Sequence, residues 1–240
     1  MIERTRFNAA VKAITFDLDF TLWDLTGVIE QAEERAQRFL AARYPEVGAR
    51  FGVQGLRDLH RHLAAESTFL RHNVTALRKA VFRTAGATLG YRDRELDALV
   101  ADTYTEFWEA RHEVVLYDDT IPALEALHGR FLIGAVTNGN ADVRRLRLEH
   151  YFDFVVSAVE VGASKPSHLI FDVVGERAGV PARQVVHIGD DPESDVIGAA
   201  RNGLQAVWLN RAATGWPSQL ERVPHLECRG LQELCAVLAV

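Results

Sequence analysis

The sequence has few cysteines and no long hydrophobic segment, and both absences exclude whole classes of protein. Only Cys228 and Cys235 are present among 240 residues, so there is no disulfide framework of the kind that stabilises small secreted domains. His225 lies near both cysteines, but three candidate ligands without a fourth make a poor zinc site. No apolar run reaches the ~18 residues of a membrane-spanning helix. The start, MIERTRFNAAVKAITFD, does not resemble a secretory signal. We therefore expect a cytoplasmic protein with reduced thiols and no membrane partner.

An excess of basic residues is also absent. The chain has 27 Lys and Arg against 33 Asp and Glu, a net charge of −6, whereas nucleic-acid-binding proteins usually carry a basic face. The densest basic group, VRRLRLEH at 143–150, is interpreted as the solvated face of a helix. We expect no nucleic-acid partner. The composition is otherwise globular, with 48% hydrophobic and 25% charged residues and no repeats or low-complexity segments.

Short apolar runs alternate with helix-like stretches over most of the chain. Buried strands are predicted at 13–17, 131–138, 152–158, 184–190 and 205–210. Helices are predicted at 141–152, 166–179, 192–203 and 231–240; the second and third of these begin with proline and end with glycine. This alternation predicts an α/β fold, a Rossmann-like, doubly wound parallel sheet with helices on both faces.

Residues 25–115 break the alternation because they contain no convincing strand. The stretch VIEQAEERAQRFLAARY has its apolar residues at a helical spacing, at Val28, Ala32, Ala36, Phe39 and Leu40. FLRHNVTALRKAVFRTAG and ELDALVADTYTEFWEARH show the same period. An insertion of about 90 residues is too long for a simple crossover. We expect a helical cap domain over 25–115, above the ligand edge of a catalytic core formed by 1–24 and 116–240.

Two carboxylates follow the first predicted strand, in ITFDLDFTLWD at 14–24. Residues two apart in a strand face the same side, so Asp17 and Asp19 can point into one site. Ligands of open parallel sheets bind outside the carboxyl ends of the strands, which is where these acids lie. Like charges this close cost free energy unless a partner compensates for them, so the other strand ends should supply that partner.

Anion-binding groups and further acids follow the other strands. Thr137 and Asn138 end the second, and Lys165 precedes a helix that begins at Pro166, a position suited to phosphate. The fourth ends in HIGDDPESD, with acids at Asp190, Asp191 and Asp195. Mg²⁺ prefers carboxylate and water oxygens and would relieve the repulsion among the acids. The sequence therefore predicts a site for a divalent metal and a phosphate.

Together these motifs resemble those of the haloacid dehalogenase superfamily of phosphohydrolases. The matching residues, in the family's order, are Asp17-Leu18-Asp19-Phe20-Thr21, then Thr137, then Lys165-Pro166, then Gly189-Asp190 with Asp195. By this resemblance the helical insert is the family's type 1 cap. TNGN, SKP, HIGDD and AVWLN look most like bacterial phosphatases acting on flavin mononucleotide or related sugar phosphates. The family usually has Gly or Asp where this chain has Phe20, a ring that can reshape the turn or the pocket.

The resemblance implies a magnesium-dependent phosphatase of a small phosphorylated metabolite. Asp17 would be the nucleophile that forms an aspartyl-phosphate. Asp19 would protonate the leaving oxygen and then take a proton from water. The other implied roles are metal binding by Asp17, the Asp19 carbonyl and Asp190, phosphoryl binding by Thr137, the Asn138 amide and Lys165, and support from Asp191 or Asp195.

Other functions stay open at this point. A 2-haloacid dehalogenase shares the fold but lacks the second Asp, whereas a phosphomutase keeps both acids. A non-catalytic phosphate-sensing module is much shorter and has no cap. In the insert, Arg71, His72, Thr75 and Arg78 could contact the substrate, although a polar helix face is the alternative interpretation. His187 lies inside an apolar strand and is interpreted as a core histidine.

Overall fold

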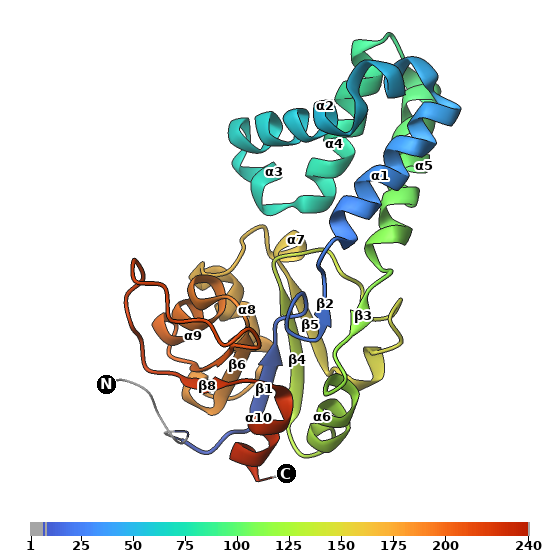
Figure 1. Ribbon diagram of the computed structural model, residues 1–240. Helices are drawn as coiled ribbons and strands as arrows, with labels where there is room; N and C mark the ends of the chain where they lie inside the picture. Colours follow the sequence, from blue (N-terminus) through green and yellow to red (C-terminus); the bar gives the residue numbers. More distant parts are fainter. Residues whose placement is uncertain (1–6, 8, 240) are drawn as a thin grey trace. The chain divides into compact units, whose positions relative to one another are not determined.

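The computed structural model describes residues 7 and 9–239 (Figure 1). The chain forms two compact units, Met1–Asp24 with Val115–Val240, and Leu25–Val114. Within the described residues, no helix combines the length and the apolar character needed to cross a membrane.

The first unit is built on a six-stranded sheet in the order β5-β4-β1-β6-β7-β8 (Figure 1). Every neighbouring pair is parallel. The chain runs from β1 to β4 and β5 on one side and returns to β6, β7 and β8 on the other. This confirms the doubly wound α/β fold and creates a switch point beside β1, where such sheets bind ligands. The strands are β1 (Ala13–Phe16), β4 (Leu132–Thr137), β5 (Phe154–Ser157), β6 (Val185–Gly189), β7 (Gln205–Leu209) and β8 (Leu226–Cys228).

The central strand is buried on both faces. Ala13 packs into a hydrophobic cluster with Ile170 and Phe171 of α8 (His168–Ala178), while Ile14 and Phe16 point to the other face and have no exposed surface. A strand buried on both sides lacks polar alternation, which is why AITF appears in the sequence as a continuous apolar run. Two further helices, α6 (Thr120–Leu127) and α10 (Leu231–Leu238), pack against each other.

The predicted helices have different outcomes. The helix predicted at 166–179 is α8, which ends at Gly179 with φ 61°. The stretch 192–203 starts as a π-helix, Pro192–Ile197, and continues as α9 (Gly198–Arg201). The final helix is α10.

The helix predicted over 141–152 is wrong, since only Glu149–Tyr151 form a short 3₁₀ turn there. Two local features oppose a helix. The Asp142 carboxylate accepts a hydrogen bond from the Arg144 backbone N–H at 3.0 Å, which competes with helical pairing. Arg147 has φ 57°, a left-handed conformation that a right-handed helix cannot contain. Side-chain periodicity does not reveal either feature.

A short antiparallel pair was not predicted. β2 (Trp23–Asp24) pairs with β3 (Val115–Leu116), in the part of the first unit that borders the helical insert in sequence. Two-residue strands carry too little periodicity to be recognised in a sequence. The pair matters because Trp23 contacts the site described below.

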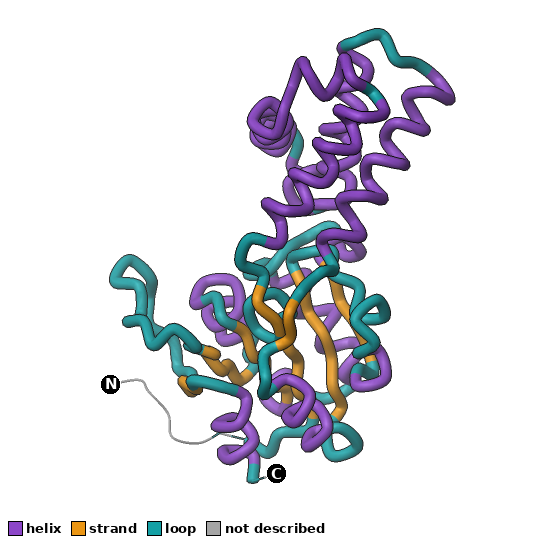
Figure 2. Tube along the Cα trace, turned by 45° about the vertical axis from the view of Figure 1, so that its right-hand side comes forward, coloured by secondary structure: helices purple, strands orange, loops and turns teal. Residues whose placement is uncertain are grey.

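The second unit is entirely helical among its described residues (Figure 2). Its helices are α1 (Val28–Arg43), α2 (Pro45–Glu66), α3 (Thr68–His72), α4 (Val74–Thr88) and α5 (Asp93–Arg111). Four of the five apolar positions predicted in α1 are buried and Phe39 is half-buried. The stretch 69–86 is two helices, because the Asn73 side chain accepts from the Ala76 N–H and caps α4.

Candidate active site

The strand ends of the first unit form a cleft of about 230 Å³. The backbone N–H of Asp17 donates to the Ile188 carbonyl at 2.8 Å, which holds the first acid at the switch point between β1 and β6. Thr137 is the last residue of β4, and Asp190 directly follows β6. The cleft brings together every site residue predicted for this unit, namely Asp17, Asp19, Thr137, Asn138, Lys165, Asp190, Asp191 and Asp195.

Lys165 is the buried cation of this cleft. Its Nζ lies 2.6 Å from Asp17 Oδ1, 2.6 Å from Asp195 Oδ1 and 2.9 Å from the Val136 carbonyl, so all three ammonium hydrogens have an acceptor. The side chain is 2% exposed. Burial alone would lower the pKa of Lys165, but the two carboxylates outweigh it and raise the pKa, so the side chain stays charged.

The pKa values of the two acids that share Lys165 are shifted in opposite directions. Burial raises the pKa of Asp17 well above its ordinary value, because Lys165 compensates it only in part. Burial opposes ionisation of Asp195 too, but Lys165 and a hydrogen bond from His187 outweigh it and lower the pKa of that carboxyl. Asp195 is therefore the permanent anion beside Lys165, and Asp17 still lacks part of its compensating charge.

A second row of buried groups holds Asp195 from behind. His187 Nε2 lies 3.0 Å from Asp195 Oδ1, and His187 Nδ1 lies 2.9 Å from the Thr15 hydroxyl. Burial lowers the pKa of His187, so the ring is neutral. A carboxylate only accepts hydrogen bonds, so Nε2 carries the hydrogen, and the Thr15 hydroxyl shares its one hydrogen between Nδ1 and the Val186 carbonyl, which lies 3.3 Å away. The sequence indicated a core histidine; its contact with Asp195 appears only in the folded chain.

Gly189 is required by the close approach of Asp195. A Cβ at this position would lie 2.1 Å from Asp195 Oδ2, a distance at which atoms overlap. The glycine before Asp190 in the HIGDD motif is therefore explained by packing against the acid six residues later.

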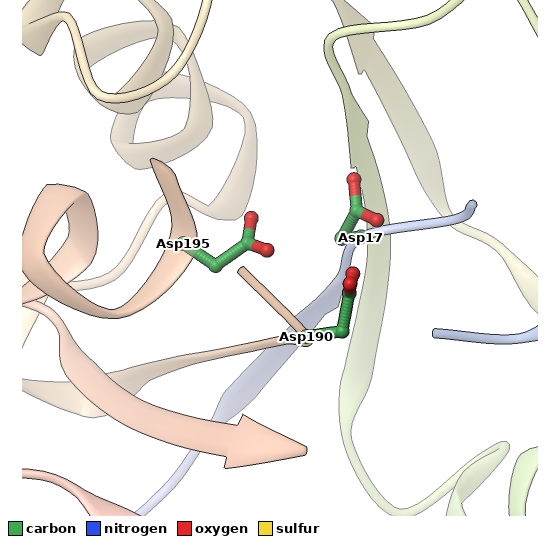
Figure 3. A group of neighbouring side chains, drawn as sticks. All are labelled: Asp17, Asp190 and Asp195. Carbon is green, nitrogen blue, oxygen red and sulfur yellow. The ribbon is translucent and has the colours of Figure 1, made fainter. Parts of the chain in front are cut away.

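Asp190 completes a cluster of three acids. Asp17, Asp190 and Asp195 each place a carboxylate oxygen within 4.8 Å of the others, and Figure 3 shows the three side chains converging. Burial, followed by the charges of Asp195 and Asp191, raises the pKa of Asp190 to about 7. Its Oδ1 accepts a hydrogen bond of 3.3 Å from the Thr21 hydroxyl.

The donor set of this cluster fits a divalent cation such as Mg²⁺, which binds oxygen ligands. Asp195 is occupied, since its oxygens accept from Lys165, from His187 and from the Asp191 N–H at 3.1 Å. Asp17 and Asp190 are therefore the two acids suited to direct contact with a metal.

Asp191 and Asp195, which the sequence did not distinguish, have different partners. Asp191 Oδ1 accepts from the Glu193 N–H at 3.0 Å and the Ser194 N–H at 2.6 Å, so it caps the helical turn after β6. Asp195 pairs with Lys165 instead.

Asp19 is held by a tryptophan. The Trp23 indole N–H donates to Asp19 Oδ1 at 2.8 Å, and Trp23 itself is fully buried. This contact orients the second acid of the DxD pair in the same cleft as Asp17. Residues four apart can meet in this way because the chain turns between Asp19 and β2.

Thr137 and Asn138 have distinct environments. The Thr137 hydroxyl oxygen accepts from the Gly139 N–H at 2.9 Å, which leaves the hydroxyl hydrogen to be donated. The Asn138 side chain accepts from the Lys165 N–H at 2.7 Å and donates to the Lys165 carbonyl at 3.0 Å. Asn138 thus positions Lys165, and a contact with phosphate would come from its backbone amide.

The four residues predicted in the insert lie on α3 and α4. Arg78 is 8% exposed, donates to Glu33 at 3.0 Å and lies 4.3 Å from the centre of the Phe107 ring. The Thr75 hydroxyl lies 3.3 Å from the Tyr104 hydroxyl. Arg71 donates to the Ala64 carbonyl at 3.3 Å, and His72 ends α3. Arg78 thus has structural partners within its own unit, and substrate contact by this group stays a prediction.

Comparison with known proteins identifies one matching family and several similar proteins. A family model described as haloacid dehalogenase-like hydrolase matches residues 11–203. The 5-amino-6-(5-phospho-D-ribitylamino)uracil phosphatase of Escherichia coli (strain K12) is 32% identical over 233 residues, 95% of this chain and 96% of that protein. The glyceraldehyde 3-phosphate phosphatase of Methanopyrus kandleri is 30% identical over 208 residues, 84% of each chain. A crystal structure described as a 2-haloacid dehalogenase from Pseudomonas syringae pv. Tomato DC3000 aligns with a TM-score of 0.89 and 37% identity, over 95% of this chain and 98% of that one.

Proposed function

The chain belongs to the haloacid dehalogenase-like hydrolase family, as its motifs indicated, and from that premise we propose that it is a magnesium-dependent phosphatase of a small phosphorylated metabolite. One observation carries the proposal. A second carboxylate, Asp19, lies in the cleft of Asp17 and Lys165 and is oriented by Trp23. An ester needs a proton for its leaving oxygen, and Asp19 can supply it.

The proposed reaction has two steps. An oxygen of Asp17 attacks phosphorus, the bond to the leaving oxygen breaks, and Asp19 donates its proton to that oxygen. Water then attacks the aspartyl-phosphate, Asp19 takes the proton from this water, and Asp17 is released with inorganic phosphate. The Trp23 N–H donates to Asp19 Oδ1, which fixes the orientation of the carboxyl group that carries the proton.

Positive charge and hydrogen-bond donors stabilise the phosphoryl group as it transfers. Lys165 and the Thr137 hydroxyl both line the cleft around Asp17. The Thr137 hydroxyl can donate to a phosphoryl oxygen, and Lys165, whose hydrogens already have acceptors in the free site, attracts the phosphoryl oxygens through its positive charge. The Asp17 and Asp190 carboxylates, with the Asp19 carbonyl, would hold Mg²⁺. When bound, Mg²⁺ would supply positive charge that offsets the repulsion among the acids and favours the transferring phosphoryl group.

The relatives support a phosphorylated sugar or polyol as the substrate class. One is named as a phosphatase of a phosphoribitylamino-uracil and another as a phosphatase of glyceraldehyde 3-phosphate. Flavin mononucleotide and sugar phosphates are therefore the first compounds to test on this chain.

A 2-haloacid dehalogenase is the second candidate, because a solved structure with that description is 37% identical to the chain. The chemistry of Asp19 argues against it. A carboxylate that displaces a halide releases an ion that needs no proton, so a second acid has no part in that reaction.

The test is phosphate release from p-nitrophenyl phosphate and from a panel with flavin mononucleotide and sugar phosphates, with Mg²⁺ or with a chelator. We expect metal-dependent turnover that Asp17→Asn abolishes. Asp172→Asn, which makes the same change at an exposed position of α8, should match wild type. Full activity in Asp17→Asn would refute the mechanism. Chloride release from 2-chloropropionate, without turnover of any ester, would establish the dehalogenase.

A further inference from the structure

Phe20, the residue after the proposed acid Asp19, has an unfavourable backbone conformation and an exposed aromatic ring. Its φ is 60°, in the left-handed region that bulky residues rarely adopt, and its side chain is 41% exposed. Glycine would adopt the same backbone without strain, so the fold does not require a ring here. Strain of this kind persists mainly where a residue serves a function.

A second cavity adjoins the cleft at this residue. It has a volume of about 330 Å³, and Phe20 and Asp190 line both spaces. Its other walls include Tyr117, Trp208 and Pro217. The cavity therefore begins where the phosphoryl site ends, and most of its wall is aromatic or apolar, as in sites that bind small organic ligands.

The walls of this cavity are held in place before any ligand binds. The Arg211 guanidinium carbon lies 4.0 Å from the centre of the Tyr117 ring, and Arg211 is itself fixed by two hydrogen bonds to Asp119, at 2.8 and 3.0 Å. Asn210 donates to the Thr214 carbonyl at 2.7 Å and accepts from the Thr214 N–H at 3.0 Å. A preformed aromatic wall loses little entropy when a ring packs on it.

We propose that this cavity binds the leaving group of the substrate, and that the leaving group carries a flat heteroaromatic ring that packs against Phe20 and Tyr117. This rests on the proposed phosphatase function. Phe20 and Asp190 stand between the two spaces, so the ring must be joined to its phosphate by a spacer, such as a sugar or polyol chain, that passes Phe20. The Tyr117 hydroxyl can donate to or accept from polar ring edges, and the Thr214 hydroxyl, which donates to Asn210 Oδ1 at 3.2 Å, can accept from them. A short ester without a ring would leave the cavity unfilled.

The test compares esters that differ only in the ring. One pair is flavin mononucleotide and ribitol 5-phosphate, and the other is uridine 5′-monophosphate and ribose 5-phosphate. For at least one pair, wild type should show a kcat/KM about tenfold higher for the ester with the ring, as expected for one stacked base. Phe20→Gly should reduce that ratio to less than threefold. Val237→Ala removes an exposed apolar side chain on α10 and should leave the ratio unchanged.

A binding measurement separates the cavity from catalysis. Riboflavin has the ring and the chain but no phosphate, so quenching of its fluorescence reports the cavity alone. We expect wild type to bind it and Phe20→Gly to lose that binding, with no decrease in the thermal unfolding midpoint, since glycine tolerates this backbone.

The possible outcomes are distinct. Hydrolysis with no preference for either ring, or with a preference that persists in Phe20→Gly, would overturn the cavity assignment and leave the phosphatase intact. If no ester is hydrolysed, the proposed function fails and riboflavin decides: binding that needs Phe20 supports the ring site, and absence of binding refutes it.

Discussion

Binding of Mg²⁺ should weaken markedly below pH 7, because protons compete with the metal for Asp190. Burial, then the charges of Asp195 and Asp191, raises the pKa of this carboxyl to about 7. A carboxyl with that pKa is about nine-tenths ionised at pH 8 and about one-tenth at pH 6. The apparent Kd for Mg²⁺ should therefore rise about tenfold from pH 8 to pH 6, roughly 1.4 kcal/mol. Burial also raises the pKa of Asp17, so tenfold is the lower limit.

Isothermal titration calorimetry in buffers with different heats of ionisation measures both the affinity and the protons released. Asp190 alone should release about 0.9 proton per metal at pH 6 and about 0.1 at pH 8. Asp190→Asn should weaken binding and remove this release. Asp172→Asn, which makes the same change at an exposed position of α8, should keep the pH dependence. An apparent Kd that is equal at pH 6 and pH 8, with no proton released, would show that Asp190 is not the metal ligand.

Three other residues around Asp195, namely His187, Gly189 and Lys165, can be tested by substitution. His187→Met should lower kcat at least about tenfold, because it removes the donor to Asp195. His187→Gln keeps an N–H at the same reach and should retain most of the activity. The measurement is kcat from pH 5 to 9, and an equal loss of activity in both variants would show that His187 has a merely structural role. Gly189→Ala should abolish turnover and destabilise the fold by about 1–3 kcal/mol in urea unfolding, because its Cβ would overlap Asp195. Gly175→Ala is the control, since a Cβ at this position of α8 meets nothing within 4 Å, and its effect on stability should be neutral or favourable. Equal losses of stability in the two alanine variants would disprove the packing argument. Lys165→Met should weaken inhibition by inorganic phosphate at least about tenfold, and an unchanged inhibition constant would remove Lys165 from the phosphate site.

Much of the site could be inferred from the sequence because strands obey a local rule. A strand such as AITF, buried on both faces, appears as an unbroken apolar run, and the residue that follows it must lie at the edge of the sheet. That rule placed Asp17, Thr137, Lys165 and Asp190 at one edge, and the structure brings all four into one cleft. The helix predicted at 141–152 failed because Arg147 adopts a left-handed backbone, which a pattern of apolar residues does not encode.

The sequence by itself thus determined the α/β class, the strand ends and the acids and cations that meet there, since each depends on residues close together in the chain. Only the tertiary structure decided how those groups interact. Lys165 meets Asp17 across 148 residues and Asp195 across 30, and His187 acts on the site through a contact that its own strand does not predict. The pKa of Asp190 and the cavity beside Phe20 likewise arise from burial by distant segments. Desolvation and packing depend on the whole fold, so no local pattern can specify them.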